Sequence, residues 1–262
     1  MPWIRRFRML LLSGILGVLT PVLGPAGESA GYVMPPEQVL EYMAKHVLGF
    51  ESLGMVLESP REQDENEGEG PVQKKVWFRP PDTVHVHPGD DGEGGVFPWL
   101  ESGVLALFCG DSREAERLLA RLSVGLHYSA YDRLEGIVVY RIGLPPGDGP
   151  LLLVEKKRFI PLLLVFEPPG ARVEERARVR FNDYRKIGDG WFPYEIVCHT
   201  ASGVSRAYTV RDVSVNTPAR DWISASPEAK APVGDRDKKA SGRLERALRT
   251  FEEKYGPDGG GE

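Results

Sequence analysis

The sequence predicts a mainly β protein of the α+β class, built on an antiparallel sheet or barrel. Beyond residue 126, short runs rich in β-branched and aromatic residues follow one another, separated by Gly, Pro or charged turns. Within residues 173–181, apolar side chains occupy every odd position except 175 and charged ones the even positions, as in a strand with one buried face. The 262 residues suffice for one large all-β domain or two smaller ones, with a substantial core.

The first 26 residues are expected to be a signal peptide for export to the periplasm, outside that core. Three Arg residues precede an apolar stretch at positions 9–23, which is short for a membrane span of roughly 20 residues. Gly24 and Ala26 supply the small residues of a cleavage site near Ala26.

The net charge argues against a partner bound through bulk positive charge. Removing residues 1–26 would take away three Arg and no acidic residue, and would change the net charge from −5 to −8. An acidic protein is poorly suited to bind nucleic acid or an anionic lipid surface in this way, and we expect no nucleic-acid partner.

Two helices and a series of strands are expected. Residues 35–48 carry Val39, Leu40 and Met43 at helical spacing, and Asp111 with Glu114 three positions later is typical of a helix start. Residues 104–109 are expected to be a strand or a buried run. Strands are expected at 52–59, 72–79, 83–87, 126–130, 136–142, 151–154, 159–167, 173–184, 190–199 and 205–215.

Residues 151–154 and 159–167 are apolar on both strand faces. Antiparallel strands usually keep one face in water, so these two need cover on both sides. A helix packed inside a curved sheet, or a ligand cavity, would supply it.

The two cysteines, Cys109 and Cys198, leave two alternatives open. An oxidising compartment permits a disulfide, which would close a loop of about 90 residues and contribute up to ~4–5 kcal/mol. The other alternative is a pair of buried free thiols, since both lie in apolar context.

A metal site is weakly indicated. His85 and His87 share one face of a strand, with Asp90 and Asp91 close behind, but no third ligand has a fixed spacing. Surface histidines are the better interpretation, and we expect no metal and no cofactor.

Catalytic motifs are not found, so we expect a protein that is not an enzyme. Cys198 and His199 are neighbours that a strand would point to opposite faces, and Glu195 is the one carboxylate worth inspecting as a buried acid. The row Arg176, Arg178 and Arg180 is interpreted as a solvated face, with an acidic or phosphate-bearing partner as the alternative.

The order of segments from Gly136 to Asn216 resembles the periplasmic outer-membrane lipoprotein-sorting proteins, the superfamily of the lipoprotein carrier LolA and its receptor LolB. Residues 140–143 read YRIG, and residues 151–166, LLLVEKKRFIPLLLVF, contain a charged turn and a Pro-led strand. The hairpin FNDYRKIGDGWFP at 181–193 and a strand ending VSVN at 213–216 follow. About a third of the chain carries the resemblance.

The resemblance implies an incomplete, strongly curved antiparallel β-barrel with helices closing its mouth and enclosing a hydrophobic cavity. It implies lipoprotein acyl chains or phospholipid as partners, with an inner-membrane transporter and an outer-membrane receptor as further candidates, and we expect a monomer. The cavity lining is expected to include Val76, Phe78, Leu151, Leu153, Ile160, Leu162, Leu164, Phe166, Phe181, Trp191 and Ile196. The lid is expected to include Leu40, Met43, Val47, Leu118 and Leu122.

The expected organisation is a signal peptide at 1–26, a LolA/LolB-like lipid-binding domain at 27–224, and a linker with a helical extension at 225–262. The expected function is a periplasmic carrier that transfers lipoproteins or lipids toward the outer membrane. The alternative is an envelope sensor or adaptor of the same fold, with its interior filled by side chains and a surface that binds a protein. The Arg row is interpreted as facing water.

Overall fold

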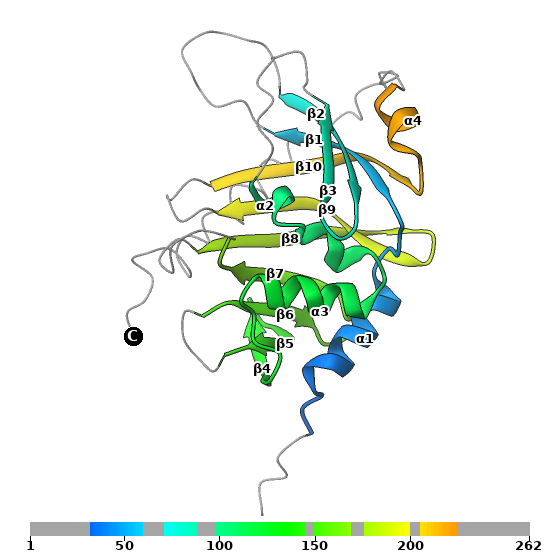
Figure 1. The fold of residues 1–262 in the computed structure, drawn as a ribbon. Helices are drawn as coiled ribbons and strands as arrows, with labels where there is room; N and C mark the ends of the chain where they lie inside the picture. The colour runs from blue at the N-terminus through cyan, green and yellow to red at the C-terminus, as the bar shows by residue number, and fades with distance from the viewer. Residues whose placement is uncertain are drawn as a thin grey trace, which may run out of the picture. The chain divides into compact units, whose positions relative to one another are not determined.

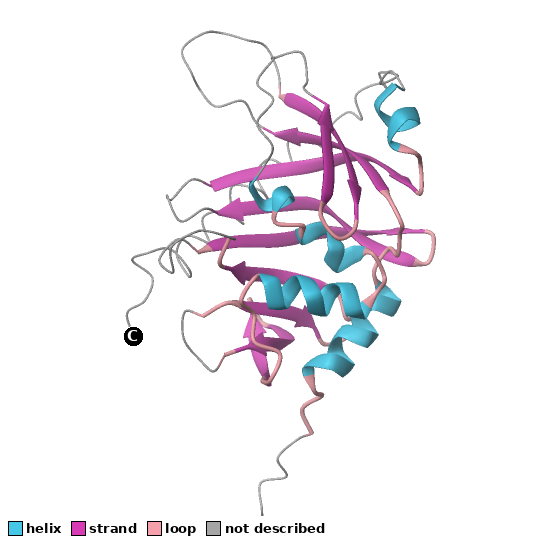
Figure 2. Cartoon of the chain, viewed as in Figure 1, coloured by secondary structure: helices cyan, strands magenta, loops and turns pink. Residues whose placement is uncertain are grey.

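Within the residues that the structure describes, ten strands form one antiparallel sheet, and all the helices but the last cover one of its faces (Figures 1 and 2). The computed structural model describes residues 32–59, 71–87, 98–144, 149–168, 176–199 and 205–224. The strands are β1 (Leu53–Ser59), β2 (Val72–Arg79), β3 (Thr83–His87), β4 (Ser129–Leu134), β5 (Ile137–Gly143), β6 (Leu151–Glu155), β7 (Pro161–Phe166), β8 (Ala177–Ile187), β9 (Gly190–His199) and β10 (Ser205–Val215). The helices are α1 (Pro36–His46), α2 (Pro98–Glu101), the 3₁₀ helix η1 (Val104–Phe108), α3 (Ser112–Arg121) and α4 (Ala219–Ser224).

The strand order explains why helices lie across the sheet. The order is β3-β2-β1-β10-β9-β8-β7-β6-β5-β4, so β3 and β4, which are consecutive in the chain, are the two edge strands. The connection between them must therefore cross the sheet, and it contains α2, η1 and α3, which lie in front of the strands in Figure 1. The topology thus places apolar helices against one face.

The sheet is strongly curved and does not close, because β3 and β4 do not pair with each other. Two irregularities contribute to the curvature: one in the β1–β10 pairing at Val56/Leu57, and one in the β6–β7 pairing at Leu153/Val154. The prediction of an incomplete, strongly curved antiparallel barrel with covering helices is confirmed.

The two expected helices form, and local sequence explains their ends. Helix α1 begins with Pro36, whose missing N–H costs nothing in a first turn, and it buries Val39, Leu40 and Met43. Helix α3 is capped by Asp111, whose carboxylate accepts a 2.9 Å hydrogen bond from the Arg113 backbone N–H. Both helices turn their apolar stripe toward the sheet.

The structure differs from the expected elements in two places and adds two short helices. Of the two alternatives for residues 104–109, the buried run is correct and the strand is wrong: Val104–Phe108 is a buried 3₁₀ helix, because the chain there crosses the sheet rather than pairing with it. The strand expected at 126–130 lies later, at Ser129–Leu134, where it pairs with β5. The short helices α2 and α4 were not expected.

Some expectations fall outside the described residues. They include the signal peptide at 1–26 and the extension at 225–262. Among the helices that the structure describes, none has the length and apolarity needed to span a bilayer.

An ion pair between Glu58 of β1 and Arg211 of β10 joins these two strands. The Arg211 guanidinium donates to both carboxylate oxygens of Glu58, with Nε–Oε2 at 2.9 Å and Nη2–Oε1 at 2.5 Å. Burial raises the pKa of Glu58, but hydrogen bonds from Arg211 and Gln73 and the charge of Arg211 outweigh it, so the pKa lies below its ordinary value. The ionised form is therefore the one that stabilises the fold.

Glu58→Gln is expected to lower the free energy of unfolding at pH 7 by about 1 kcal/mol, since it removes a charged acceptor whose side chain is largely buried but whose partner Arg211 is partly exposed. A depressed pKa contributes stability above the unfolded-state pKa and loses it as pH falls through the folded-state value. The difference between wild type and variant should therefore shrink from pH 5 toward pH 2. Urea unfolding across this range measures it, and a gap that stays constant with pH would contradict the assignment.

Candidate functional site

The candidate site is the apolar core between the helices and the concave face of the sheet, which we call the interior core. Six expected lining residues lie in it, each at most 1% exposed: Val76, Phe78, Leu164, Phe166, Phe181 and Ile196. The five expected lid residues lie in it from the helix side: Leu40, Met43, Val47, Leu118 and Leu122. Strands far apart in the sequence thus face one layer of helices, made of α1, α2, η1 and α3, which we call the helix layer.

The other five expected lining residues lie elsewhere, around an apolar cluster on the opposite face of the sheet, which we call the outer cluster. Leu153, Ile160 and Leu162 belong to it, and Leu151 and Trp191 pack against it. Leu151 and Leu153 alternate with inward-facing neighbours on β6, and Leu162 is the extra residue of the β6–β7 irregularity, which turns it outward. These five are not candidates for the lining of the interior core.

Phe108 of η1 occupies the centre of the interior core. It is 0% exposed and packs edge-to-face against Phe181 at 5.1 Å and Phe192 at 5.3 Å between ring centroids. Sequence reasoning missed this residue. The signal that could have found it was the wholly apolar run VLALF at 104–108, which fits a segment surrounded by core on all sides.

The helix layer is held together by its own backbone. The Gly49 N–H donates to the Phe108 carbonyl and the Phe50 N–H to the Cys109 carbonyl, both at 3.0 Å. These bonds join the segment after α1 to η1, and α1 and α3 also pack against each other. The helices therefore form one connected layer.

Polar contacts join this layer to the sheet at several points. Arg121 of α3 pairs with Asp82 in the β2–β3 turn at 3.3 Å, and the Ser129 hydroxyl of β4 donates to the Met34 carbonyl at 2.7 Å. A single bridge joins Val47 to Trp191 of β9. Inside the interior core, Trp99 of α2 and Tyr208 of β10, whose rings lie 5.8 Å apart, pack together beside the apolar side chains.

Close packing at Gly190 secures the Val47 bridge. A Cβ at this position would overlap the Val47 carbonyl oxygen and the Leu48 Cα, and would lie 2.7 Å from the Leu48 nitrogen. The hairpin residue Gly190 is therefore required for the end of α1 to reach β9.

Gly190→Ala is expected to lower the free energy of unfolding by about 1–3 kcal/mol, because backbone rather than a flexible side chain must move. It should also speed amide hydrogen exchange at residues 46–48. Gly125→Ala is the matched control, since its Cβ would meet only Leu144 Cδ2 at 4.0 Å. Equal stability and exchange in the two variants would show that this contact is unimportant.

Both cysteines are free thiols in this structure, with Cys198 buried and Cys109 partly buried. Cys198 lies within the interior core and Cys109 packs against it from the helix side. Burial raises the pKa of both thiols. A thiol that stays protonated at neutral pH is a poor nucleophile, so neither cysteine has the environment of a catalytic group.

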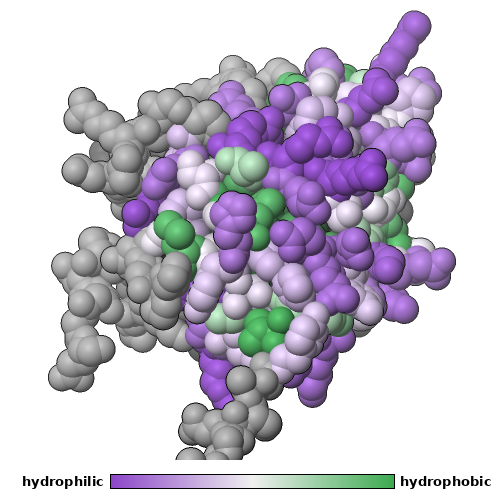
Figure 3. Space-filling model, turned by 60° about the horizontal axis from the view of Figure 1, so that its bottom comes forward, coloured by the Kyte–Doolittle hydropathy of each residue, from purple (hydrophilic) through white to green (hydrophobic). Residues whose placement is uncertain are grey.

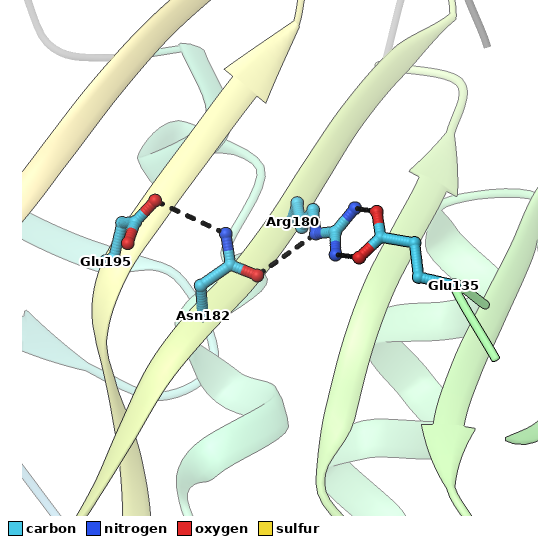
Figure 4. Close-up of polar contacts among 4 residues, drawn as sticks. All are labelled: Glu135, Arg180, Asn182 and Glu195. Carbon is cyan, nitrogen blue, oxygen red and sulfur yellow. Dashed lines mark hydrogen bonds and ion pairs between the residues drawn. The ribbon is translucent and has the colours of Figure 1, made fainter. Parts of the chain in front are cut away.

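The expectation that the Arg row faces water is wrong for Arg180. The Arg180 side chain is 9% exposed, and its guanidinium donates hydrogen bonds to both carboxylate oxygens of Glu135 in the β4–β5 turn (Figure 4). Arg180 Nε also donates to Asn182 at 3.0 Å, and Asn182 approaches Glu195 at 3.5 Å. This network occupies the outer face beside the outer cluster, and half-buried Glu195 belongs to it.

The two histidines of β3 have a surface environment. His85 and His87 are exposed, and the His85 ring lies 5.5 Å from that of Trp77. Asp90 and Asp91 lie outside the described residues. Within the part of the chain that the structure describes, no three His, Cys, Asp or Glu residues group as a metal site would require.

This chain is similar to several solved structures. No family model matches the chain, and no curated protein matches it. A LolA superfamily protein from Nitrosomonas europaea has a TM-score of 0.43 and 12% identity, covering 74% of this chain and 99% of that one.

Two further solved structures are similar. A putative outer membrane lipoprotein-sorting protein domain from Vibrio parahaemolyticus has a TM-score of 0.38 and 12% identity, covering 71% of this chain and 95% of that one. A DUF1329 family protein from Desulfovibrio piger has a TM-score of 0.42 and 11% identity, covering 72% of this chain and 95% of that one.

Proposed function

We propose that the protein is a periplasmic carrier that holds an acyl chain of a lipoprotein or lipid between its helix layer and the concave face of its sheet. Because the similar structures are distant, we base this on the chain's own residues. The observation that carries it is that apolar side chains line the interior core on both sides, from the helix layer and from the sheet.

Separation of the helix layer is the step that binding requires. Phe108 fills the centre of the interior core, so a chain can enter only when η1 moves away from Phe181 and Phe192. The layer can move as a unit because its internal backbone bonds stay intact. Each CH₂ of a bound chain regains about 0.8 kcal/mol of apolar burial, which offsets the packing that opening disrupts.

Native mass spectrometry and lipid extraction of the protein purified without detergent test whether it carries a chain. We expect acyl-containing species at up to one per protein. A protein that never retains or takes up acyl chains would contradict the proposal.

Cys198 provides a native reporter of opening. In a Cys109→Ser background it is the only thiol, and it is 6% exposed within the interior core. A carrier should expose Cys198 to a thiol reagent faster than the whole protein unfolds, because only the helix layer must move. Labelling that matches the global unfolding rate would argue against a mobile layer.

The second candidate is a sensor or adaptor of the same fold that binds an envelope protein and carries no lipid. The packing of Phe108 against Phe181 and Phe192 favours it, since the interior is filled in this structure. The two functions are separated by the same experiments: an adaptor retains no acyl chain and exposes Cys198 only on unfolding.

A further inference from the structure

A row of aromatic rings crosses the corner where α1, the β6–β7 turn and the β4–β5 hairpin meet. The Tyr42 ring stacks on Phe159 at 5.0 Å, Phe159 on Tyr140 at 5.7 Å, and Tyr140 lies 5.2 Å from Tyr131. The inner two rings are partly or fully covered, whereas Tyr42 and Tyr131 are 37% and 39% exposed. The row therefore joins the helix layer to the edge of the sheet and shows its two ends to solvent.

Exposed apolar side chains gather at the same corner. Ile137 and Val138 of β5 are 40% and 37% exposed, and the Val138 carbonyl accepts from the Lys156 N–H of the β6–β7 turn at 3.1 Å. Of the six exposed large apolar side chains in the described part of the chain, four are Tyr42, Tyr131, Ile137 and Val138. Figure 3 shows one face of the molecule, on which apolar residues form separate areas among hydrophilic ones.

The β6–β7 turn adds positive charge to this corner. Phe159 adopts a left-handed φ of 51°, held by its N–H bond to the Glu155 carbonyl at 2.9 Å. This conformation is unusual for a bulky residue. It accompanies a turn in which Phe159 joins the aromatic row while Lys156 and Lys157 are exposed.

The nearby carboxylates are largely neutralised. Glu155 pairs with Arg158 at 2.6 Å, and Glu135 pairs with Arg180. The Lys156 and Lys45 ammonium groups instead lie over tyrosine rings, 4.2 Å from Tyr131 and 5.2 Å from Tyr42. With Lys157, these lysines outnumber the exposed Glu41 one turn before Lys45, so the corner is locally positive on an acidic chain.

We propose that this corner docks on the surface of a bilayer that contains anionic phospholipid. We call it the corner patch, defined by Tyr42, Lys45, Tyr131, Ile137, Val138, Lys156 and Lys157. Tyrosines and short aliphatic side chains suit the interfacial zone, and lysines beside them reach the headgroups. The net negative charge does not prevent this, because surface charges are screened beyond about 10 Å whereas each lysine at the surface contributes about 1 kcal/mol.

The corner patch lies outside the interior core, so docking is tested independently of acyl-chain carriage. The protein without residues 1–26 is incubated with vesicles of phosphatidylcholine alone or of phosphatidylcholine with 30% phosphatidylglycerol, and bound protein is measured by flotation. We expect binding to the anionic vesicles only, and a decrease in binding as salt is raised.

Two variants and a matched control assign this binding to the corner patch. Lys156→Gln with Lys157→Gln should weaken vesicle binding by about tenfold or more, and Ile137→Ser with Val138→Ser by several-fold. The control, Arg79→Gln with Arg220→Gln, makes the same charge change at exposed positions on β2 and α4 and should change binding less than twofold. Circular dichroism and thermal unfolding confirm that each variant is folded.

Equal binding to both vesicle types, no binding to either, or equal loss in the patch and control variants would overturn the proposal. Because acyl-chain retention is measured separately, a failure here leaves the carrier proposal standing, and the reverse also holds.

Discussion

Phe108→Ala is expected to lower the free energy of unfolding by about 3–5 kcal/mol and, unusually for such a change, to tighten acyl-chain binding. The loss follows from removing a fully buried ring that packs edge-to-face against Phe181 and Phe192. The gain follows because the ring occupies the space that a chain would take. A cavity lined by apolar side chains stays dry and accepts apolar ligands.

Urea unfolding and titration with a fluorescent fatty-acid analogue measure the two effects. Leu163→Ala is the control, since Leu163 is 1% exposed but lies in the outer cluster. Leu163→Ala should lower the free energy of unfolding by about 2–5 kcal/mol without changing the affinity for the fatty-acid analogue. If Phe108→Ala loses stability without any increase in affinity, or if Leu163→Ala increases it equally, the interior core is not the acyl-chain site.

The second large effect on stability is expected at the ion pair between Glu135 and Arg180. Glu135→Ala should lower the free energy of unfolding by about 3 kcal/mol, because it leaves a guanidinium charge in a side chain that is only 9% exposed. Arg180→Met should lower the free energy of unfolding by less than Glu135→Ala does. The remaining Glu135 side chain is 34% exposed, so water can solvate its carboxylate, and the methionine can extend the outer cluster.

Urea unfolding of both single variants and of the double variant measures this asymmetry and the coupling between the two residues. The double variant should be close in stability to Arg180→Met, since no buried charge is left without its partner. A loss below 1 kcal/mol for Glu135→Ala, or a larger loss for Arg180→Met, would show that the guanidinium is solvated in another way.

Much of the fold follows from local patterns. Alternation on β8 predicts which side chains are dry, and Val179 and Phe181 are 1% exposed as expected. The FNDYRKIGDGWFP hairpin forms with Gly188 at a φ of 60° in its turn. The runs that are apolar on both faces do require cover on both sides, and they receive it from two different apolar clusters.

The same runs show where local patterns stop. Alternation divides β6 and β7 between two faces, but which leucines face the helices depends on the irregularity at Leu162. Since a shift of one residue exchanges the faces, the sequence alone cannot separate the interior core from the outer cluster. The expected lining residues Leu151, Leu153 and Leu162 were misplaced for this reason.

The sequence by itself determined most of the strands, the two long helices and the antiparallel sheet, because these depend on periodicity and turns within a few residues. Only the tertiary structure decided that Phe108 fills the interior and that Arg180 is buried against Glu135, which is 45 residues away. Such residues come into contact only when distant segments of the chain pack together, so their spacing in the sequence does not predict the contact.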